Sequence, residues 1–153
     1  MMNLCCDVLE KLRGKTLVTA ESCTGGGIGA ALTAIPGSSD VYKGGVICYT
    51  NFVKEHVLGV DRDTLEQIGA VSEAVAGQMA HGVRQLLKAD ISLSVTGLAG
   101  PGGDDFGNCV GTVYIGCETA DGLTVRHFVF EGDRASVRCQ AVEASLRLIM
   151  ECT

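Results

Sequence analysis

A short apolar segment runs directly into a glycine-rich turn near the start of the chain, and this junction restricts the folds open to it. Residues 16–20 are typical of a buried strand, and residues 28–35 are typical of a helix that stops at Pro36-Gly37. The residues between them, 21–27, read Glu-Ser-Cys-Thr-Gly-Gly-Gly. Helical N–H groups are unpaired at such a turn, and glycines let an anion approach them closely. The junction therefore indicates either a tightly packed turn or a cradle for an anion or substrate.

Composition limits the classes of protein to which the chain can belong. Its 153 residues fit one domain, 1–153, which can bury a core without disulfides or metals. The net charge of -6 argues against a nonspecific nucleic-acid surface. No apolar run approaches the roughly 20 residues of a membrane span, and no secretory signal is evident, so we expect a cytoplasmic protein without a membrane partner. The 8 cysteines include no C-x-x-C pair and the 3 histidines are scattered, which predicts reduced thiols and no metal site.

Hydrophobic periodicity and turn residues predict the remaining elements. We expect helices over residues 3–13, 51–58, 62–68 and 73–87, buried strands over 45–49 and 91–96, a hairpin of 111–119 and 123–130 around Asp121-Gly122, and a last helix that begins after Asp133. With the strand and helix at the opening junction, these ranges give the order α-β-α-β-α-α-α-β-β-β-α. It predicts a three-layer α/β/α sandwich around a mixed, mostly parallel sheet of about five strands, with a C-terminal hairpin and helix.

Three loops are expected at the carboxyl ends of the strands, where open α/β sheets bind their ligands. These loops are residues 21–26, 50–54 and 97–107. They contribute the polar side chains of Ser22, Thr24, Tyr49, Asn51, Lys54 and Thr96.

Each of these side chains has a structural interpretation beside a functional one. Ser22 is either a helix cap or a nucleophile, and Lys54 is either a solvated helix lysine or the base of a Ser-Lys pair. Tyr49 has the pattern of a half-buried sheet aromatic, and Asn51 that of a helix cap. The last helix carries Arg134 and Arg138 one turn apart, as a surface ion-pair row or as a phosphate clamp.

A dinucleotide site is disfavoured. Residues 25–30 match the pattern G-x-G-x-x-A after a strand. A ribose carboxylate at the end of the second strand is missing, because that position reads Tyr49-Thr50-Asn51.

Five spaced motifs closely resemble the C-terminal domain of the CinA family, which includes stand-alone nicotinamide-nucleotide amidohydrolases of the PncC type. The motifs are E-S-C-T-G-G (21–26), Y-T-N-F-V-K (49–54), V-S-E-A-V (71–75), T-G-L-A-G-P (96–101) and F-E-G-D-R-A-S-V-R (130–138). They cover nearly the whole chain in order. One departure is Asn108-Cys109, where family members usually have Lys-Pro, which predicts a less basic or differently shaped loop over residues 102–108.

The resemblance implies hydrolysis of the carboxamide of nicotinamide mononucleotide to nicotinate mononucleotide and ammonia, without a cofactor or metal, by a homodimer. It implies catalytic roles for Ser22 as nucleophile, Lys54 as general base and Tyr49 in orienting the pair. The substrate-binding residues it implies are Thr24, Gly25, Gly26, Asn51, Thr96, Gly97, Arg134 and Arg138, with the amides of the two glycines holding an oxyanion or the phosphate. The alternative is a non-catalytic pyridine-nucleotide-binding or regulatory module related to competence- and damage-inducible proteins.

Overall fold

A computed structural model describes residues 1–153, and its elements follow the predicted order, with three helices between the second and third strands. The elements are α1 (Met2–Lys11), β1 (Leu17–Glu21), α2 (Gly27–Thr33), β2 (Tyr42–Ile47), α3 (Asn51–Leu58), α4 (Arg62–Gln67), α5 (Glu73–Leu87), β3 (Ile91–Gly97), β4 (Thr112–Thr119), β5 (Gly122–Val129) and α6 (Arg134–Cys152), with a short 3-10 turn at Ser38–Asp40. No helix is both long and apolar enough to cross a membrane.

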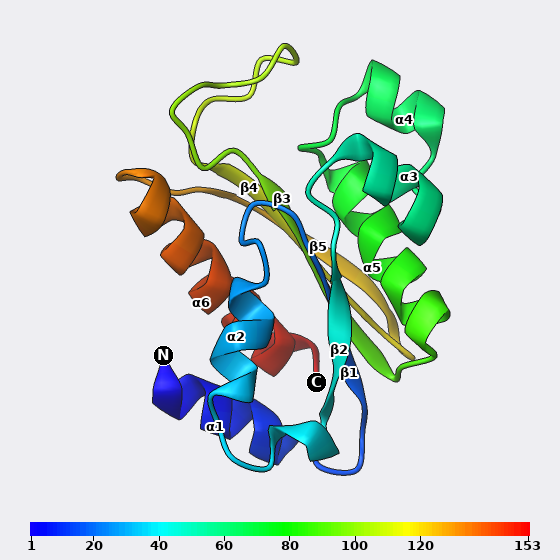
Figure 1. Ribbon diagram of the computed structural model, residues 1–153, viewed down its shortest axis with the longest axis vertical. Helices are drawn as coiled ribbons and strands as arrows, with labels where there is room; N and C mark the ends of the chain where they lie inside the picture. The colour runs from blue at the N-terminus through cyan, green and yellow to red at the C-terminus, as the bar shows by residue number, and fades with distance from the viewer.

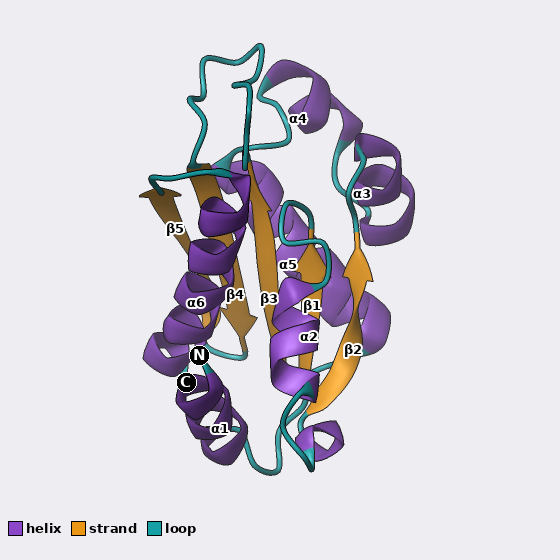
Figure 2. Ribbon diagram, turned by 60° about the vertical axis from the view of Figure 1, so that its left-hand side comes forward, coloured by secondary structure: helices purple, strands orange, loops and turns teal.

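One five-stranded sheet in the order β2-β1-β3-β4-β5 forms the middle layer. The β2-β1 and β1-β3 pairs are parallel, and the β3-β4 and β4-β5 pairs are antiparallel. Helices α1, α2 and α6 cover one face, and α3, α4 and α5 lie on the other (Figures 1 and 2). The predicted α/β sandwich with a mixed sheet and a C-terminal hairpin and helix is confirmed.

Alternation along β1 divides the core into two clusters. Leu17 packs into the cluster under α1, α2 and α6, whereas Val18 and Ala20 pack into the cluster under α5. Successive side chains of a strand point to opposite faces, so Glu21 lies on the same face as Leu17, toward α2. This parity places a carboxylate beneath the start of that helix.

Three local predictions need correction. The second strand is not buried, since β2 pairs with β1 alone at the edge of the sheet and its side chains alternate between half-buried and exposed. Helix α3 is capped by Thr50, whose hydroxyl accepts the Val53 N–H at 3.4 Å, and not by Asn51. Because Thr119 pairs with Gly122, the two loop residues of the hairpin are 120 and 121, one position earlier than expected.

Candidate active site

Ser22 and Lys54 meet at the carboxyl edge of the sheet. Ser22 follows β1 directly, and Lys54 lies in the first turn of α3, four residues after the Thr50 cap. Because β1 and β2 are parallel neighbours, the segments that follow them emerge at the same edge. The Lys54 Nζ lies 3.0 Å from the Ser22 Oγ and donates to the Cys48 carbonyl oxygen at 2.7 Å. The solvated-lysine interpretation of Lys54 is therefore wrong.

Burial controls the charge of this amine. Lys54 is 2% exposed, and both its hydrogen-bond partners are uncharged oxygen atoms. Burial lowers the pKa of Lys54 from its ordinary value, and the nearby thiols of Cys48 and Cys23 oppose this only in part. A neutral amine has a lone pair that can accept the Ser22 hydroxyl proton.

The two neighbouring thiols are not competing nucleophiles. Burial raises the pKa of both Cys23 and Cys48 to about 11. Reactive cysteines need a depressed pKa, because the thiolate is the nucleophile. Both side chains therefore remain protonated and fill apolar space beside Lys54, in keeping with the prediction of reduced thiols.

A cavity of about 280 Å³ opens beside the Ser22–Lys54 pair. It brings together residues from the three predicted loops and from the start of α6. The predicted site residues that line it are Ser22, Tyr49, Asn51, Lys54, Thr96, Gly97 and Arg134. Sequence analysis did not select the other lining residues, Cys23, Ala70, Val71, Leu98, Ala99, Gly100 and Gly102. Most of these contribute small or apolar surface, which carries no chemical signature in a single sequence.

Thr24, Gly25 and Gly26 do not line this cavity, and their polar groups are occupied within the protein. The Thr24 hydroxyl and the Gly26 N–H both donate to the Glu21 carboxylate, at 2.7 and 3.1 Å. The Gly25 N–H donates to the Ser22 carbonyl at 3.0 Å. The glycine-rich turn is thus a packed turn in this structure, and its amides donate to the Glu21 carboxylate or to backbone carbonyls of the turn itself.

The two arginines of α6 have different positions. Arg134 lines the cavity and donates to the Gly100 carbonyl at 2.6 Å and to the Tyr49 hydroxyl at 2.8 Å. Arg138 lies outside the cavity and donates to the carbonyls of Cys23 and Thr24, each at 3.0 Å. Neither arginine belongs to the surface ion-pair row that was one interpretation of their spacing. Arg134 links two cavity loops, and Arg138 holds the backbone of the two residues that follow Ser22.

The other lining residues support the cavity through internal contacts. The Thr96 hydroxyl donates to the Ala70 carbonyl at 2.8 Å. Tyr49 is largely exposed, and its hydroxyl contacts Arg134 rather than the Ser22–Lys54 pair, so its orienting role stays a prediction. In the loop over residues 102–108, where the sequence differs from the usual family pattern, the Asn108 side-chain amide donates to Asp104 at 2.8 Å and to the Val71 carbonyl at 3.1 Å. The hydrogen bond to Val71 fastens the loop to the cavity wall.

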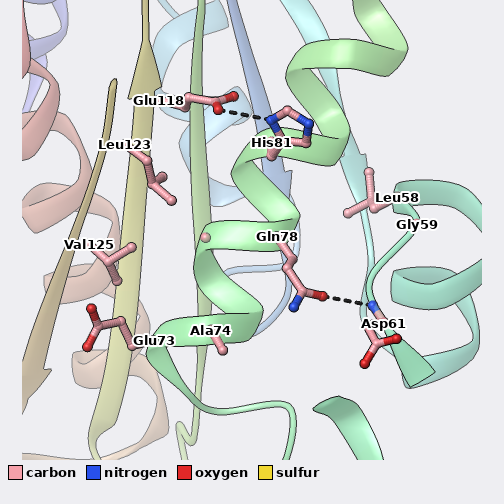
Figure 3. A pocket seen from close by; sticks show the side chains of 11 residues that line it. Leu58, Gly59, Asp61, Glu73, Ala74, Gln78, His81, Glu118, Leu123 and Val125 are labelled. Carbon is pink, nitrogen blue, oxygen red and sulfur yellow. Dashed lines mark hydrogen bonds and ion pairs between the residues drawn. The ribbon is translucent and has the colours of Figure 1, made fainter. Parts of the chain in front are cut away.

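A larger cavity, of about 530 Å³, lies along α5, away from these residues. Figure 3 shows two polar contacts in it: His81 meets Glu118 at 3.0 Å, and the side-chain Oε1 of Gln78 accepts the Asp61 N–H at 2.7 Å. None of the predicted site residues lines it. No group of three or more His, Cys, Asp or Glu side chains is arranged to hold a metal ion anywhere in the protein.

Sequence reasoning also missed the role of Glu21, which directly precedes Ser22 but does not line the cavity. It ends a wholly buried strand and is itself 2% exposed. A charged residue at the end of an apolar strand, one short turn before a helix with no acidic residue in its first turn, is the signal that could have identified it.

Comparisons with known proteins agree with this architecture. The family model of the CinA C-terminal domain matches residues 2–153. A putative competence-damage inducible protein of Halothermothrix orenii is 54% identical over 123 residues, which are 80% of this chain and 30% of that protein. A CinA-like protein of Thermosynechococcus vestitus is 52% identical over the same shares of each chain. The chain therefore spans about a third of the length of the curated relatives it matches.

Solved structures are similar over almost the whole chain. A CinA superfamily protein from Escherichia coli has a TM-score of 0.97 at 33% identity, covering 99% of this chain and 90% of its own. The competence damage-inducible protein A of Klebsiella pneumoniae has a TM-score of 0.95 at 37% identity, covering 98% and 94%. By its family match, its sequence relatives and its fold, this chain belongs to the CinA C-terminal domain family.

Proposed function

We propose that this domain hydrolyses the carboxamide of nicotinamide mononucleotide to nicotinate mononucleotide and ammonia. The observation that carries the proposal is the 3.0 Å contact between the Ser22 Oγ and a buried Lys54 amine of lowered pKa, at the wall of a 280 Å³ cavity. A nucleophile within hydrogen-bond reach of its base supports covalent acyl transfer. The choice of substrate rests on the five motifs shared with nicotinamide-nucleotide amidohydrolases.

The proposed reaction has two half-reactions. The Ser22 Oγ attacks the carboxamide carbon while its proton passes to the Lys54 Nζ. As the C–N bond breaks, Lys54 returns this proton to the leaving nitrogen, so ammonia departs and an acyl ester on Ser22 remains. A water molecule then attacks the ester, giving its proton to Lys54, which protonates the Ser22 oxygen as the carboxylate product leaves. One amide and one water thus become one carboxylic acid and one ammonia.

Turnover of the mononucleotide is the direct test. We expect ammonia and nicotinate mononucleotide to form in equal amounts when the purified domain is incubated with nicotinamide mononucleotide. Mass spectrometry of a proteolytic digest, prepared after rapid quenching, should show the acyl ester on the peptide that contains Ser22. Binding of the nucleotide without ammonia release would reject the hydrolase and favour the regulatory-module alternative.

Arg134 is the proposed phosphate contact, because it is the arginine that lines the cavity. We expect Arg134→Gln to raise KM for the mononucleotide by roughly 10- to 100-fold, as for loss of a charge-assisted hydrogen bond of about 1.5–3 kcal/mol. KM for nicotinamide riboside, which lacks the phosphate, should change much less. Arg147→Gln removes only a surface pair with Glu143 and is the matched control. Equal changes for both substrates would place the phosphate elsewhere.

A further inference from the structure

We propose that Glu21 is the positioning residue of the Ser22–Lys54 pair, an inference that rests on the proposed hydrolysis. Glu21 directly precedes Ser22 and has a buried side chain. It faces α2, as its parity with Leu17 along β1 requires. A buried carboxylate is costly unless it is fully hydrogen-bonded, so its surroundings reveal what it holds in place.

The Glu21 carboxylate gathers donors from both sides of the nucleophile. Its Oε2 accepts the Thr24 hydroxyl at 2.7 Å and the N–H groups of Gly26 and Ile28 at 3.1 and 3.0 Å, and its Oε1 accepts the Gly29 N–H at 2.9 Å and the Thr19 hydroxyl at 3.4 Å. All five donors are uncharged. The amides at the start of α2, which have no partner within the helix, and the positive end of the helix dipole stabilise the negative charge. One side chain thereby fixes the angle between β1 and α2, and Ser22 lies in the turn between them.

The main chain of Glu21 reaches the second member of the pair. Its carbonyl oxygen accepts the Cys48 N–H at 2.8 Å, and the Cys48 carbonyl oxygen in turn accepts the Lys54 amine at 2.7 Å. The Ser22 carbonyl oxygen accepts the Gly25 N–H at 3.0 Å. Glu21 thus holds the Ser22 turn through its carboxylate and the acceptor of Lys54 through its backbone. A displacement of about 1 Å in such a constellation can cost about 10²-fold in rate.

Two substitutions of Glu21 separate geometry from general stability. Glu21→Gln replaces a carboxylate oxygen that now accepts N–H groups with an NH₂ group, which cannot accept them. Glu21→Asp keeps the charge but shortens the side chain. We expect either change to lower kcat by roughly 10- to 100-fold with KM for nicotinamide mononucleotide within about threefold of wild type. The control is Leu32→Val, which removes a methylene from the buried side of α2, the helix that Glu21 contacts, without changing the carboxylate. It should leave kcat unchanged.

A fluorophosphonate probe measures the reactivity of Ser22 without the natural substrate. The Ser22 Oγ forms a bond to phosphorus, the P–F bond breaks, fluoride leaves and the hydroxyl proton passes to Lys54. The rate constant should fall in the Glu21 variants by the same factor as kcat, and in a Ser22→Ala background Glu21→Gln should cause no further loss of residual turnover. If the wild type labels but does not hydrolyse the nucleotide, the proposed substrate fails while the labelling rates still test Glu21.

Three results would overturn the assignment. One is wild-type labelling and kcat in both Glu21 variants. Another is a loss confined to KM. The third is an equal loss of kcat in Leu32→Val at matched melting temperature. Should Glu21→Gln not fold, Glu21→Asp alone decides, with an expected loss of about 10-fold in both readouts.

Discussion

Ser22→Ala is expected to lower kcat for nicotinamide mononucleotide by at least about 10³-fold while leaving the dissociation constant of the nucleotide within about threefold. In the proposed reaction the Ser22 Oγ attacks the carboxamide carbon, and the methyl group of alanine can neither attack nor exchange a proton with Lys54. Most of the cavity surface is unchanged, so binding should persist. Steady-state ammonia release and isothermal titration with the nucleotide measure the two quantities.

Ser92→Ala is the matched serine control. Ser92 is fully buried, and its hydroxyl donates to the Ala80 carbonyl at 2.7 Å, away from the cavity. Its loss should cost about 1 kcal/mol of stability and leave kcat unchanged. A Ser22→Ala protein that retains a tenth or more of wild-type turnover would exclude Ser22 as the nucleophile.

Lys54→Met is expected to abolish turnover and to remove a pH-dependent part of the stability. The methionine side chain has nearly the same length as that of lysine but has no titratable group. In the wild type, burial lowers the Lys54 pKa in the folded state below the roughly 10.4 of a free lysine. Between these two pKa values the unfolded chain holds a proton that the folded chain has lost. The free energy of unfolding must therefore rise with pH across this window, and this contribution is absent below the folded pKa.

The measurement is chemical denaturation of wild type and Lys54→Met at a series of pH values from neutral to about 10. Other groups titrate in both proteins, so the difference between the two curves isolates Lys54. We expect wild type to gain stability relative to the variant as the pH rises. Lys43→Met, at an exposed position of β2, should show no such trend. A constant difference for Lys54→Met would show that the folded pKa of Lys54 is not lowered.

Sequence alone was sufficient where local chemistry decides the structure. Asp61, Ser72 and Asp133 each accept an N–H from the first turn of the helix that follows, and these three helices begin at the predicted residues. The three loops converge because parallel strands end at one edge of the sheet, which follows from element order. The pairing of Ser22 with Lys54 came from the shared motifs, and the structure supplies the distance.

Several of the errors depend on contacts that the local sequence does not show. Whether a strand such as β2 lies at an edge depends on which neighbours it pairs with, and residues 45–47 alone cannot show this. The glycine-rich turn was open to an anion on sequence grounds. In the structure, the side chain of Glu21 points toward α2, and its carboxylate already occupies the place of that anion. The two arginines one turn apart on α6 likewise diverge, because Arg134 reaches Gly100 and Arg138 reaches Cys23.

The central claim is that a neutral, buried Lys54 is the base for Ser22, and the pH dependence of kcat/KM for nicotinamide mononucleotide tests it most directly. Above pH 7 the substrate phosphate, with a second pKa of about 6, is fully ionised, so its titration does not interfere. We expect kcat/KM to rise to a plateau with one apparent pKa clearly below the roughly 10.4 of free lysine, and Lys54→Met to show no such rise. A wild-type profile that climbs only around or above that value, or substantial turnover by Lys54→Met, would contradict the account.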